Sequence, residues 1–446
     1  MKFTLKREIP IKQGYDLVVV GGGPGGCGTA IAAGRRGLRV LLVEATGALG
    51  GMGTQAMVSA WSHMSNGEET VLGGLMWDLV ETMHARGFIP EKYDRTFWTK
   101  IHNRGLGYST EGLKLILDEW CADAGVDVRF YTKLVEVEAE STRVGGVVLH
   151  DCEGLSFVEA PMFVDATGDA VLSHLAGAET LRAGVDTPNI NPPTLCSVHA
   201  GIDHSVFDRR KHQPYIDKAV DDGFFTQPDR HVPGLFPSGP SSATLNAGHL
   251  FGVDALNAKA LSEAMAKGRR FAWEYGRFCK EYLPGCENIE LLATASLLGV
   301  RESRRIVGEY ELTHEDYKQR RKFDDQIAIY CKQIDIHVYD ISDAEYEKYL
   351  EEFNKSALLA PGETYGLPYR ILVPRGFENL WVAGRINSSD VKVAAAIRDQ
   401  PAAFLMGEAV GAAATQALSA GETSCGLDTK RLVKDLISSG SNIPST

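Results

Sequence analysis

The sequence predicts an α/β fold, in which a parallel sheet forms the main domain and an α+β cap domain is inserted into it. Short apolar runs of strand length recur at widely separated places and alternate with segments of helical period. Between them, residues 180–250 are rich in Pro, Asn, Ser and Gly, which is typical of a loop-heavy excursion. Residues 402–420 form a Gly- and Ala-rich helical segment that can pack tightly against the first strand–helix unit.

Composition limits the classes of function. The 446 residues suffice for two or three packed regions, and 44% hydrophobic with 23% charged residues is ordinary for a soluble globular protein. The formal charge of −12 argues against a nucleic-acid partner, which would need basic patches. The first residues lack the apolar core of a signal peptide, and no apolar run is long enough to span a membrane. We therefore expect a cytoplasmic protein without a membrane partner.

The eight cysteines are scattered and form no C-x-x-C pair. Structural zinc sites and dithiol redox centres both need closely spaced ligand or thiol pairs. We therefore predict no metal site and a reducing compartment.

The first strand–turn–helix unit carries the strongest motif. Four apolar residues at 17–20 make a short buried strand, and the turn after it reads Gly21-x-Gly23-x-x-Gly26. In such a turn the first glycine makes the bend, the second lets a pyrophosphate approach the backbone, and the third lets the helix pack on the strand. Pro24 and Gly25 complete the turn, and the helix at 24–36 offers its N-terminal N–H groups to the phosphates. This is a Rossmann-like dinucleotide site.

The next strand and the loop after it indicate which dinucleotide is bound. Residues 38–43 form the second apolar strand, which ends in Glu44 and Ala45. A carboxylate at this position accepts the ribose hydroxyls and repels the extra phosphate of NADP. A second glycine cluster follows, which indicates a ligand longer than adenosine diphosphate, and FAD fits. Its predicted contact residues are Gly50, Gly51, Met52 and Thr54.

The remaining elements follow from periodicity. An amphipathic helix at 111–124 has Leu113, Ile116 and Leu117 on its apolar face. Further helices are expected at 75–86, 257–281 and 402–420, with a polar stretch of helical period at 315–355. Further strands are expected at 127–131, 133–139, 146–150, 156–160, 162–166 and 380–383. The FAD-binding domain is predicted to comprise residues 1–55, 111–178 and 370–446, and the cap or substrate domain residues 56–110 and 179–369.

Together these motifs resemble the FAD-dependent oxidoreductases of the two-dinucleotide-binding-domain superfamily, which includes the fumarate reductase and succinate dehydrogenase flavoprotein subunits. Within it the chain looks most like a broad bacterial family called simply FAD-dependent oxidoreductases. The motifs behind the resemblance are Gly21-x-Gly23-x-x-Gly26, Glu44, Gly50-Gly51, Asp165-Ala-Thr-Gly-Asp169, the segment 299–310, Leu380-Trp-Val-Ala-Gly-Arg385 and the Ala-rich run after Gly407.

The resemblance implies further cofactor contacts. Ala166, Thr167 and Gly168 would lie near the flavin diphosphate, and the strand at 133–137 would contact adenine through Val135. Gly384 and Arg385 would lie at the ribityl chain. The last helix would point its N-terminus, at Gln400, Pro401 and Ala402, toward the pyrimidine edge of the flavin, where its dipole stabilises negative charge. Arg398, just before it, would contact the flavin or an anionic substrate.

Two departures from known relatives are informative. The membrane-complex flavoproteins carry a flavin-linking histidine before a small-residue turn, whereas residues 51–57 here contain none, so we expect non-covalent FAD. Disulfide reductases need a cysteine pair and a second glycine-rich nucleotide fold, and we find neither in this sequence.

The cap is expected to supply the catalytic side chains. His249, in a Gly-, Ser- and Thr-rich loop, is the first candidate for a general base, with a structural loop histidine as the alternative. Arg301 is a candidate for binding a carboxylate, whereas Glu302, Arg304 and Arg305 are interpreted as an internal salt-bridge network. His63 is a candidate for facing the flavin. His102 and Arg104 are candidates for lining a substrate pocket, whereas His84, His150, His174 and His337 are interpreted as ordinary histidines.

The function expected is hydride transfer between flavin N5 and a carbon of a small organic substrate. The alternatives are a non-redox protein that uses FAD structurally or in RNA modification, and an NAD-binding module. The electron donor or acceptor is not identified, and a homo-oligomer is left open.

Overall fold

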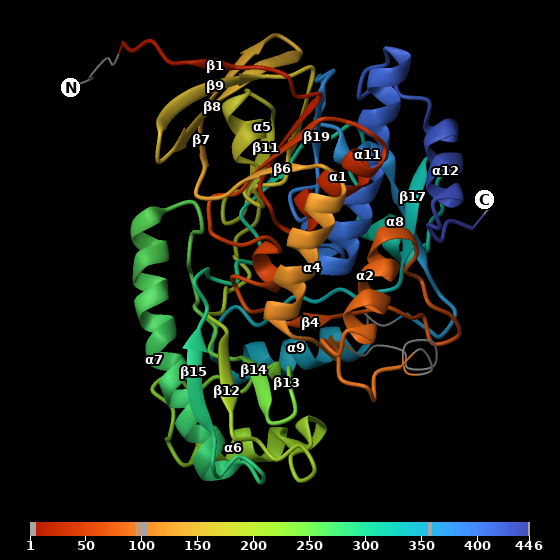
Figure 1. Ribbon diagram of the computed structural model, residues 1–446. Coiled ribbons are helices and arrows are strands. Elements are labelled where there is room, and N and C mark those ends of the chain that lie inside the picture. Colours follow the sequence, from red (N-terminus) through yellow and green to blue (C-terminus); the bar gives the residue numbers. More distant parts are fainter. Residues whose placement is uncertain (1–5, 95–96, 98–104, 356–358, 445–446) are drawn as a thin grey trace.

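The computed structural model describes residues 6–94, 97, 105–355 and 359–444 and centres on a five-stranded parallel sheet (Figure 1). In spatial order its strands are β19 (Leu380–Val382), β10 (Met162–Asp165), β2 (Leu17–Val20), β3 (Val40–Val43) and β6 (Asp127–Arg129). All neighbouring pairs run parallel. The predicted α/β class is confirmed, and three distant parts of the chain meet in this one sheet.

Two helices pack together on one face of the sheet with unusually close backbones. These are α1 (Pro24–Arg35) and the buried α11 (Gln400–Ala420). A Cβ placed on Gly407 would lie 2.2 Å from the carbonyl oxygen of Gly25, and one on Gly411 would lie 2.6 Å from that of Thr29. The prediction that the Gly/Ala-rich helix packs tightly on the first strand–helix unit is therefore confirmed.

Helices α2 (Gly74–Ala85) and α4 (Thr110–Asp123) pack beside this pair, and α12 (Thr429–Ser438) lies against α11. Within the described part of the chain, no helix is long and apolar enough to cross a membrane.

A second sheet covers the other face. It has the order β1 (Ile11–Lys12), β9 (Gly154–Glu159), β8 (Arg143–Asp151) and β7 (Lys133–Glu140). The strands expected near 146–150 and 156–160 are β8 and β9, which pair antiparallel. Val147 and Val158 of this sheet share a core with Val18 of the central sheet. This sheet forms the yellow layer near the N-terminus in Figure 1.

The segment between β10 and β19 builds a separate layer with its own core. Its four-stranded sheet has the order β13 (Gly234–Pro237), β14 (Ser242–Asn246), β12 (Ser197–Ala200) and β15 (Glu290–Thr294). Helices α7 (Ala258–Tyr282) and α6 (Gln213–Asp221) flank it, as the green part of Figure 1 shows. Phe271 and Phe278 of α7 pack in this core.

The stretch 315–355 differs from the prediction of a helical polar segment. It contains α8 (His314–Lys318), the fully buried strand β17 (Gln326–Tyr330) and α9 (Asp343–Lys355). Strand β17 pairs with β18 (Tyr365–Pro368) and joins the same large core as α11. Burial of its apolar residues outweighs the polar composition around it. The predicted domain boundaries stay a prediction.

The remaining short elements complete the connections. They are β4 (Ala60–Trp61), β5 (Leu106–Gly107), β11 (Thr180–Arg182), β16 (Arg304–Ile306), α5 (Val171–Leu175), α10 (Val391–Ile397) and the 3₁₀ turns Gly51–Gly53, Arg209–Lys211 and Tyr369–Leu372.

A buried carboxyl group makes the stability of this fold depend on pH. Burial raises the pKa of Glu408, on α11, to about 7, although its carboxylate accepts a hydrogen bond from the Leu75 N–H. The pKa of Glu408 is higher in the folded protein than in the unfolded chain. The protonated carboxyl group therefore makes its full contribution to folding stability below the unfolded pKa, and this contribution is lost as pH rises to about 7. We expect Glu408→Gln to be more stable than the wild type by about 3 kcal/mol at pH 8, with this gain fading toward pH 5. Urea unfolding at both pH values measures it.

The control for this prediction is Glu263→Gln, the same chemical change on the exposed surface of α7. It should leave the difference between the two pH values unchanged. An equal response of both variants would contradict the assignment to Glu408.

Candidate functional site

A cavity of about 860 Å³ lies where the carboxyl ends of β2, β10 and β19 meet the sheet of β12 and β14. Most of the residues predicted from the sequence line it. They are Gly21, Gly23, Pro24, Gly25, Glu44, Ala45, Gly51, Met52, His63, Ala166, Thr167, Gly168, Arg301, Gly384, Arg385, Arg398 and Gln400. Outside the lining lie Gly26, Gly50, Thr54, Val135, His249, Pro401 and Ala402.

The three motif glycines have different surroundings. Gly21 has a φ of +105°, and a Cβ there would lie 2.3 Å from the Ala166 carbonyl oxygen. A Cβ on Gly26 would lie 1.8 Å from the Gly21 carbonyl oxygen. A Cβ on Gly23 meets no described atom within 4 Å and would project into open space at the cavity. Packing therefore requires Gly21 and Gly26, whereas Gly23 leaves room for a ligand at the N-terminus of α1.

Glu44 lies at the carboxyl end of β3 and is buried. Its carboxylate accepts hydrogen bonds from the Gly22 N–H at 2.8 Å and from the Thr46 N–H and hydroxyl at 2.7 and 2.8 Å. Gly50 and Thr54 support the same loop from behind. The Gly50 N–H donates to the Gly22 carbonyl at 2.7 Å, and the Thr54 hydroxyl donates to the Leu49 carbonyl at 2.6 Å.

The turn after β10 is held by Asp165. Burial raises the pKa of this carboxyl group, although it accepts hydrogen bonds from the N–H and hydroxyl of Thr167 at 3.0 and 2.7 Å and from the Ser173 N–H at 2.8 Å. This network shapes the Ala-Thr-Gly turn. Arg385, from the turn after β19, reaches across it to Asp169 at 2.9 Å.

The residues after Arg301 make hydrogen bonds within the protein, and the ion pair among them in the described structure is that of Arg305 with Asp186, so the interpretation as a salt-bridge network stays a prediction. The Ser303 hydroxyl and the Arg304 guanidinium both donate to Asp169, at 2.6 Å to its side chain and 3.2 Å to its carbonyl. Arg305 pairs with Asp186 at 2.5 Å. The Glu302 carboxylate accepts a hydrogen bond from the backbone N–H of Asn191. The Asn191 side chain in turn accepts one from the backbone N–H of His337 at 3.1 Å. These residues therefore brace the wall of the cavity.

Helix α11 begins at the cavity with Gln400. The Gln400 side chain accepts hydrogen bonds from the Tyr108 hydroxyl at 2.7 Å and the Trp61 indole at 3.1 Å, and it donates to the Val58 carbonyl at 2.7 Å. Pro401 and Ala402 lie outside the lining, so the α11 surface facing the cavity is formed by Gln400 and Ala403.

The strand predicted to contact adenine has a shifted register. Val135 is 48% exposed and lies outside the lining, whereas its neighbours Lys133 and Leu134 line the cavity. A bulge between Leu134 and Glu136 in the pairing of β7 with β8 interrupts the regular alternation of faces. Sequence periodicity does not reveal such a shift.

The cap side of the cavity carries full charges. Arg301 is 8% exposed and donates to the Thr194 hydroxyl at 3.0 Å. Burial, helped by the nearby Arg398, lowers the pKa of Arg301 to about 10, so it remains a cation at neutral pH. Lys332 lies 3.3 Å from Asp335 and 3.5 Å from Asp399. Three cations thus share this wall with two acidic residues.

The histidines differ from the prediction. His63 is buried and lines the cavity. His249 is 1% exposed and lies behind the wall, so it does not reach a ligand in the cavity as a direct base. Its Nε2 lies 2.8 Å from Nδ1 of His337, which does line the cavity. Its place on the lining makes His337 a candidate site residue, a role that the sequence did not indicate. His102 and Arg104 lie outside the described residues.

The segment after β17 supplies the site residues that the sequence reading missed. Lys332, Gln333, Asp335 and His337 all line the cavity. The sequence Ile334-Asp-Ile-His-Val338 alternates apolar and polar residues, which is typical of an extended segment and puts Asp335 and His337 on one face. This alternation is the feature of the sequence that indicates Asp335 and His337 as site residues.

His231 joins this group, because ring nitrogens of His231, His249 and His337 lie within 4.8 Å of one another. Three histidines so close together are also candidates for holding a metal ion.

The lining fits the FAD that the sequence predicts. Gly23 leaves an open cradle at the N-terminus of α1, which has no side-chain cap. Among the described residues, the buried Nε atoms of Arg385 and Arg398 have no hydrogen-bond partner, and both arginines line the cavity. Donors left unpaired in this way are suited to phosphate, ribityl or flavin oxygens.

Comparison with known proteins agrees with this fit. The model of the family described as FAD dependent oxidoreductase matches residues 16–436. A dihydrolipoyl dehydrogenase of Trypanosoma brucei brucei is 56% identical over 46 residues, which are 10% of this chain and 10% of that protein. The chain thus matches about a tenth of the length of that relative.

Solved structures with a similar fold are distant. A geranylgeranyl bacteriochlorophyll reductase-like protein from Thermoplasma acidophilum is 15% identical, with 96% of this chain and 83% of that chain covered and a TM-score of 0.48. The myxobacterial chondrochloren halogenase CndH is 14% identical, with 96% and 78% covered and a TM-score of 0.46. Since the family model spans nearly the whole chain, the protein belongs to the FAD dependent oxidoreductase family and is an enzyme with FAD as its cofactor.

Proposed function

We propose that this enzyme exchanges a hydride with a carbon of a small organic substrate bound between the nucleotide turns and the charged cap wall. The observation that carries the proposal is that both sets of residues line one cavity, so a substrate held by the cap lies next to the cofactor site. Non-covalently bound FAD supplies hydride acceptance or donation at its N5 atom. At the finer level, we propose that the chain belongs with the fumarate reductase and succinate dehydrogenase flavoproteins, because its motifs occur in the order that is typical of that superfamily.

The chain's own residues have separable tasks in this proposal. The N-terminus of α11 presents the positive end of its dipole to the cavity and favours negative charge there. Arg301 and Arg398 attract and orient an anionic group of the substrate, because both are cationic and line the cavity. His63 lines the same space and contacts the substrate or the flavin. The electron partner is a separate small molecule or protein.

The first test of this function is reduction of the bound flavin. We expect the purified yellow protein to lose its visible flavin absorbance anaerobically with at least one substrate among alcohols, sugars, amines, enoates and NAD(P)H. Substrates with a carboxylate should react faster than neutral isosteres, since the cap wall is cationic. Absorbance is followed by stopped flow. A flavin that no donor reduces would favour the non-redox alternative.

The cofactor site is tested by two glycines of one turn. Gly23→Val should fold, because its side chain meets no described atom within 4 Å, yet it should weaken FAD binding at least about tenfold by filling the phosphate cradle. Gly26→Ala should instead destabilise the fold, since its Cβ would lie 1.8 Å from a carbonyl oxygen.

Flavin content, FAD titration of the apoprotein and its melting temperature separate the two effects. Wild-type affinity for FAD in Gly23→Val would contradict the placement of the pyrophosphate.

The role of Arg301 is tested by a substitution that keeps the positive charge but removes the planar guanidinium group, which can donate two parallel hydrogen bonds. Arg301→Lys should raise the concentration of a carboxylate substrate needed for half-maximal flavin reduction by about tenfold, with a smaller effect on the maximal rate. Arg304→Lys is the control, because Arg304 lies outside the lining and bonds to Asp169. Equal effects of the two variants would count against substrate binding by Arg301.

A further inference from the structure

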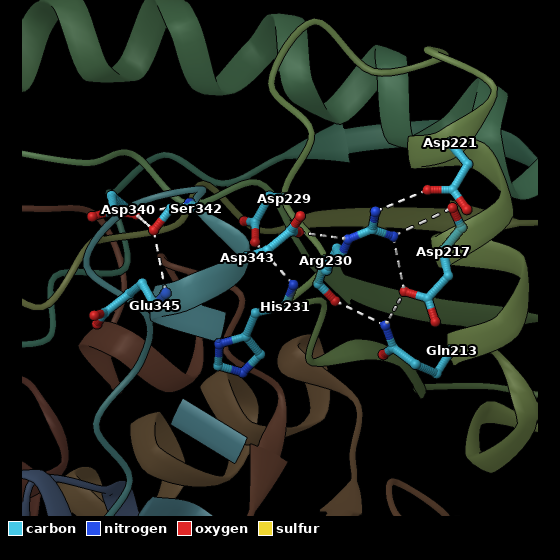
Figure 2. A network of polar contacts seen from close by, with 10 residues as sticks. All are labelled: Gln213, Asp217, Asp221, Asp229, Arg230, His231, Asp340, Ser342, Asp343 and Glu345. Carbon is cyan, nitrogen blue, oxygen red and sulfur yellow. Dashed lines mark hydrogen bonds and ion pairs between the residues drawn. The ribbon is translucent and has the colours of Figure 1, made fainter. Parts of the chain in front are cut away.

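A chain of hydrogen bonds runs from the interior of the cap to the cavity. Asp229 Oδ2 lies 2.7 Å from Nδ1 of His249, and Nε2 of His249 lies 2.8 Å from Nδ1 of His337. Asp229 and His249 are each 1% exposed and lie outside the lining, whereas His337 is on it. Figure 2 shows Asp229 and His231 beside the ion pairs of Arg230 that fix this loop. This chain of hydrogen bonds from Asp229 through His249 to His337, here called the relay, therefore ends at the cavity with His337.

The relay fixes where each proton resides. Burial alone would raise the pKa of Asp229, but His249 and His231 lower it, so the carboxylate is ionised and only accepts hydrogen bonds. A neutral His249 then carries its proton on Nδ1, facing Asp229, which leaves Nε2 as an acceptor. His337 consequently donates from Nδ1, and the lone pair of His337 is on Nε2.

The surroundings of Nε2 suit a proton acceptor. Asp335 Oδ1 lies 3.6 Å from Nε2 of His337, and Arg301, Arg398 and His231 are the other charged or titratable neighbours at this end. Burial lowers the pKa of His337 well below its ordinary value, helped by Arg301, Arg398 and the neighbouring histidines, so the ring is neutral at neutral pH. A proton gained at Nε2 would be balanced by Asp335 directly and by Asp229 through His249.

The geometry favours a proton over a metal ion between the histidines. Two nitrogens that bind a tetrahedral metal at its usual bond lengths lie about 3.3 Å apart. The His249–His337 pair is closer, at 2.8 Å. The rings of His231 and His337 are stacked, with centroids 4.7 Å apart and planes 27° apart, so their in-plane lone pairs lie in two separate and nearly parallel planes, which is unfavourable for binding one ion.

We propose that His337 is the catalytic residue that exchanges a proton with the substrate, and that His249 and Asp229 are its positioning residues. In the oxidative direction, the O–H or N–H bond of the substrate breaks and the Nε2–H bond of His337 forms. The electron pair of the broken bond becomes the new π bond to carbon, and the hydride from that carbon leaves to FAD. In the reductive direction the same proton returns. This inference rests on the proposed function.

The sharpest test is Asp229→Asn. Asp229 Oδ1 accepts a hydrogen bond from the backbone N–H of His231 at 2.9 Å. The amide oxygen of the variant should therefore stay at this position, and its NH₂ group should face His249. Since NH₂ donates, His249 would be protonated on Nε2, and His337 would change from donor to acceptor at Nδ1. Nε2 of His337 would then carry a proton and could accept none.

The first measurement needs no substrate. Nitrogen NMR of oxidised, ¹⁵N-histidine-labelled holoenzyme should show an unprotonated Nε2 for His337 in the wild type and a protonated one in Asp229→Asn. His337→Gln identifies the signal. A wild-type His337 protonated on Nε2 would overturn the relay. Stoichiometric transition metal in the purified protein that His249→Ala removes would also overturn it.

The second measurement is the rate of flavin reduction by the best substrate. Asp229→Asn and His337→Gln should each lower it about 100-fold or more, with flavin content unchanged. His199→Gln is the matched control, because His199 is also buried, bonds to the Ser197 hydroxyl at 2.9 Å and lies outside the lining. It should leave the rate unchanged. A wild-type rate of flavin reduction in Asp229→Asn would overturn only the relay. If no substrate reduced the flavin bound to the wild-type enzyme, the proposed function would be overturned, and the role of His337 with it.

Discussion

The close contact between α1 and α11 is the constraint on which the site depends. A Cβ on Gly28 would lie 2.8 Å from the carbonyl oxygen of Phe404, and one on Gly407 would lie 2.2 Å from that of Gly25. These helices approach so closely only because side chains are missing at the contact. As a result the N-termini of both helices open onto one cavity, α1 at Gly23 and α11 at Gln400. Two positive dipole ends are thereby directed at the same ligand, although they are almost 380 residues apart in the chain.

Protein hydrogen bonds brace the turns at this cavity. Glu44 holds the Gly22 N–H, Asp165 holds the Thr167 N–H, and the Asn387 side chain donates to the Gly384 carbonyl at 2.8 Å. Each of these bonds fixes a turn that follows a parallel strand. Because the turns are already braced, cofactor binding need not order them, and less conformational entropy is lost on binding.

The nucleotide half of the site could be predicted from the sequence because its signals are local. The glycines at 21–26, the acid at 44 and the turn after residue 165 each follow their own strand directly, and the structure brings these three segments to the cavity, with Gly26 packed outside its lining. The cap half could not be predicted in the same way. His337 reaches the cavity only because β17 is buried beside α11, and pairing with β18 is not visible within the segment itself. His249 was singled out for its loop, yet long-range bonds to Asp229 and His337 put it behind the wall.

The distribution of donors around the cavity explains why proton exchange falls to a histidine. Among the described lining residues, each carboxylate is already engaged by donors or cations. Glu44 accepts from Gly22, Asp169 from Arg385, and Asp399 from the Tyr330 hydroxyl, while Asp335 faces Lys332. Lys332, Arg398 and Arg301 hold the pKa of Asp335 well below its usual range, so this carboxylate is a weak base. Imidazole lone pairs remain, and among the lining histidines His337 has its tautomer set by a buried carboxylate through a second ring. The same cations that hold an anionic substrate also keep that ring neutral, and they oppose its protonation until the negative charge of the bound substrate offsets them.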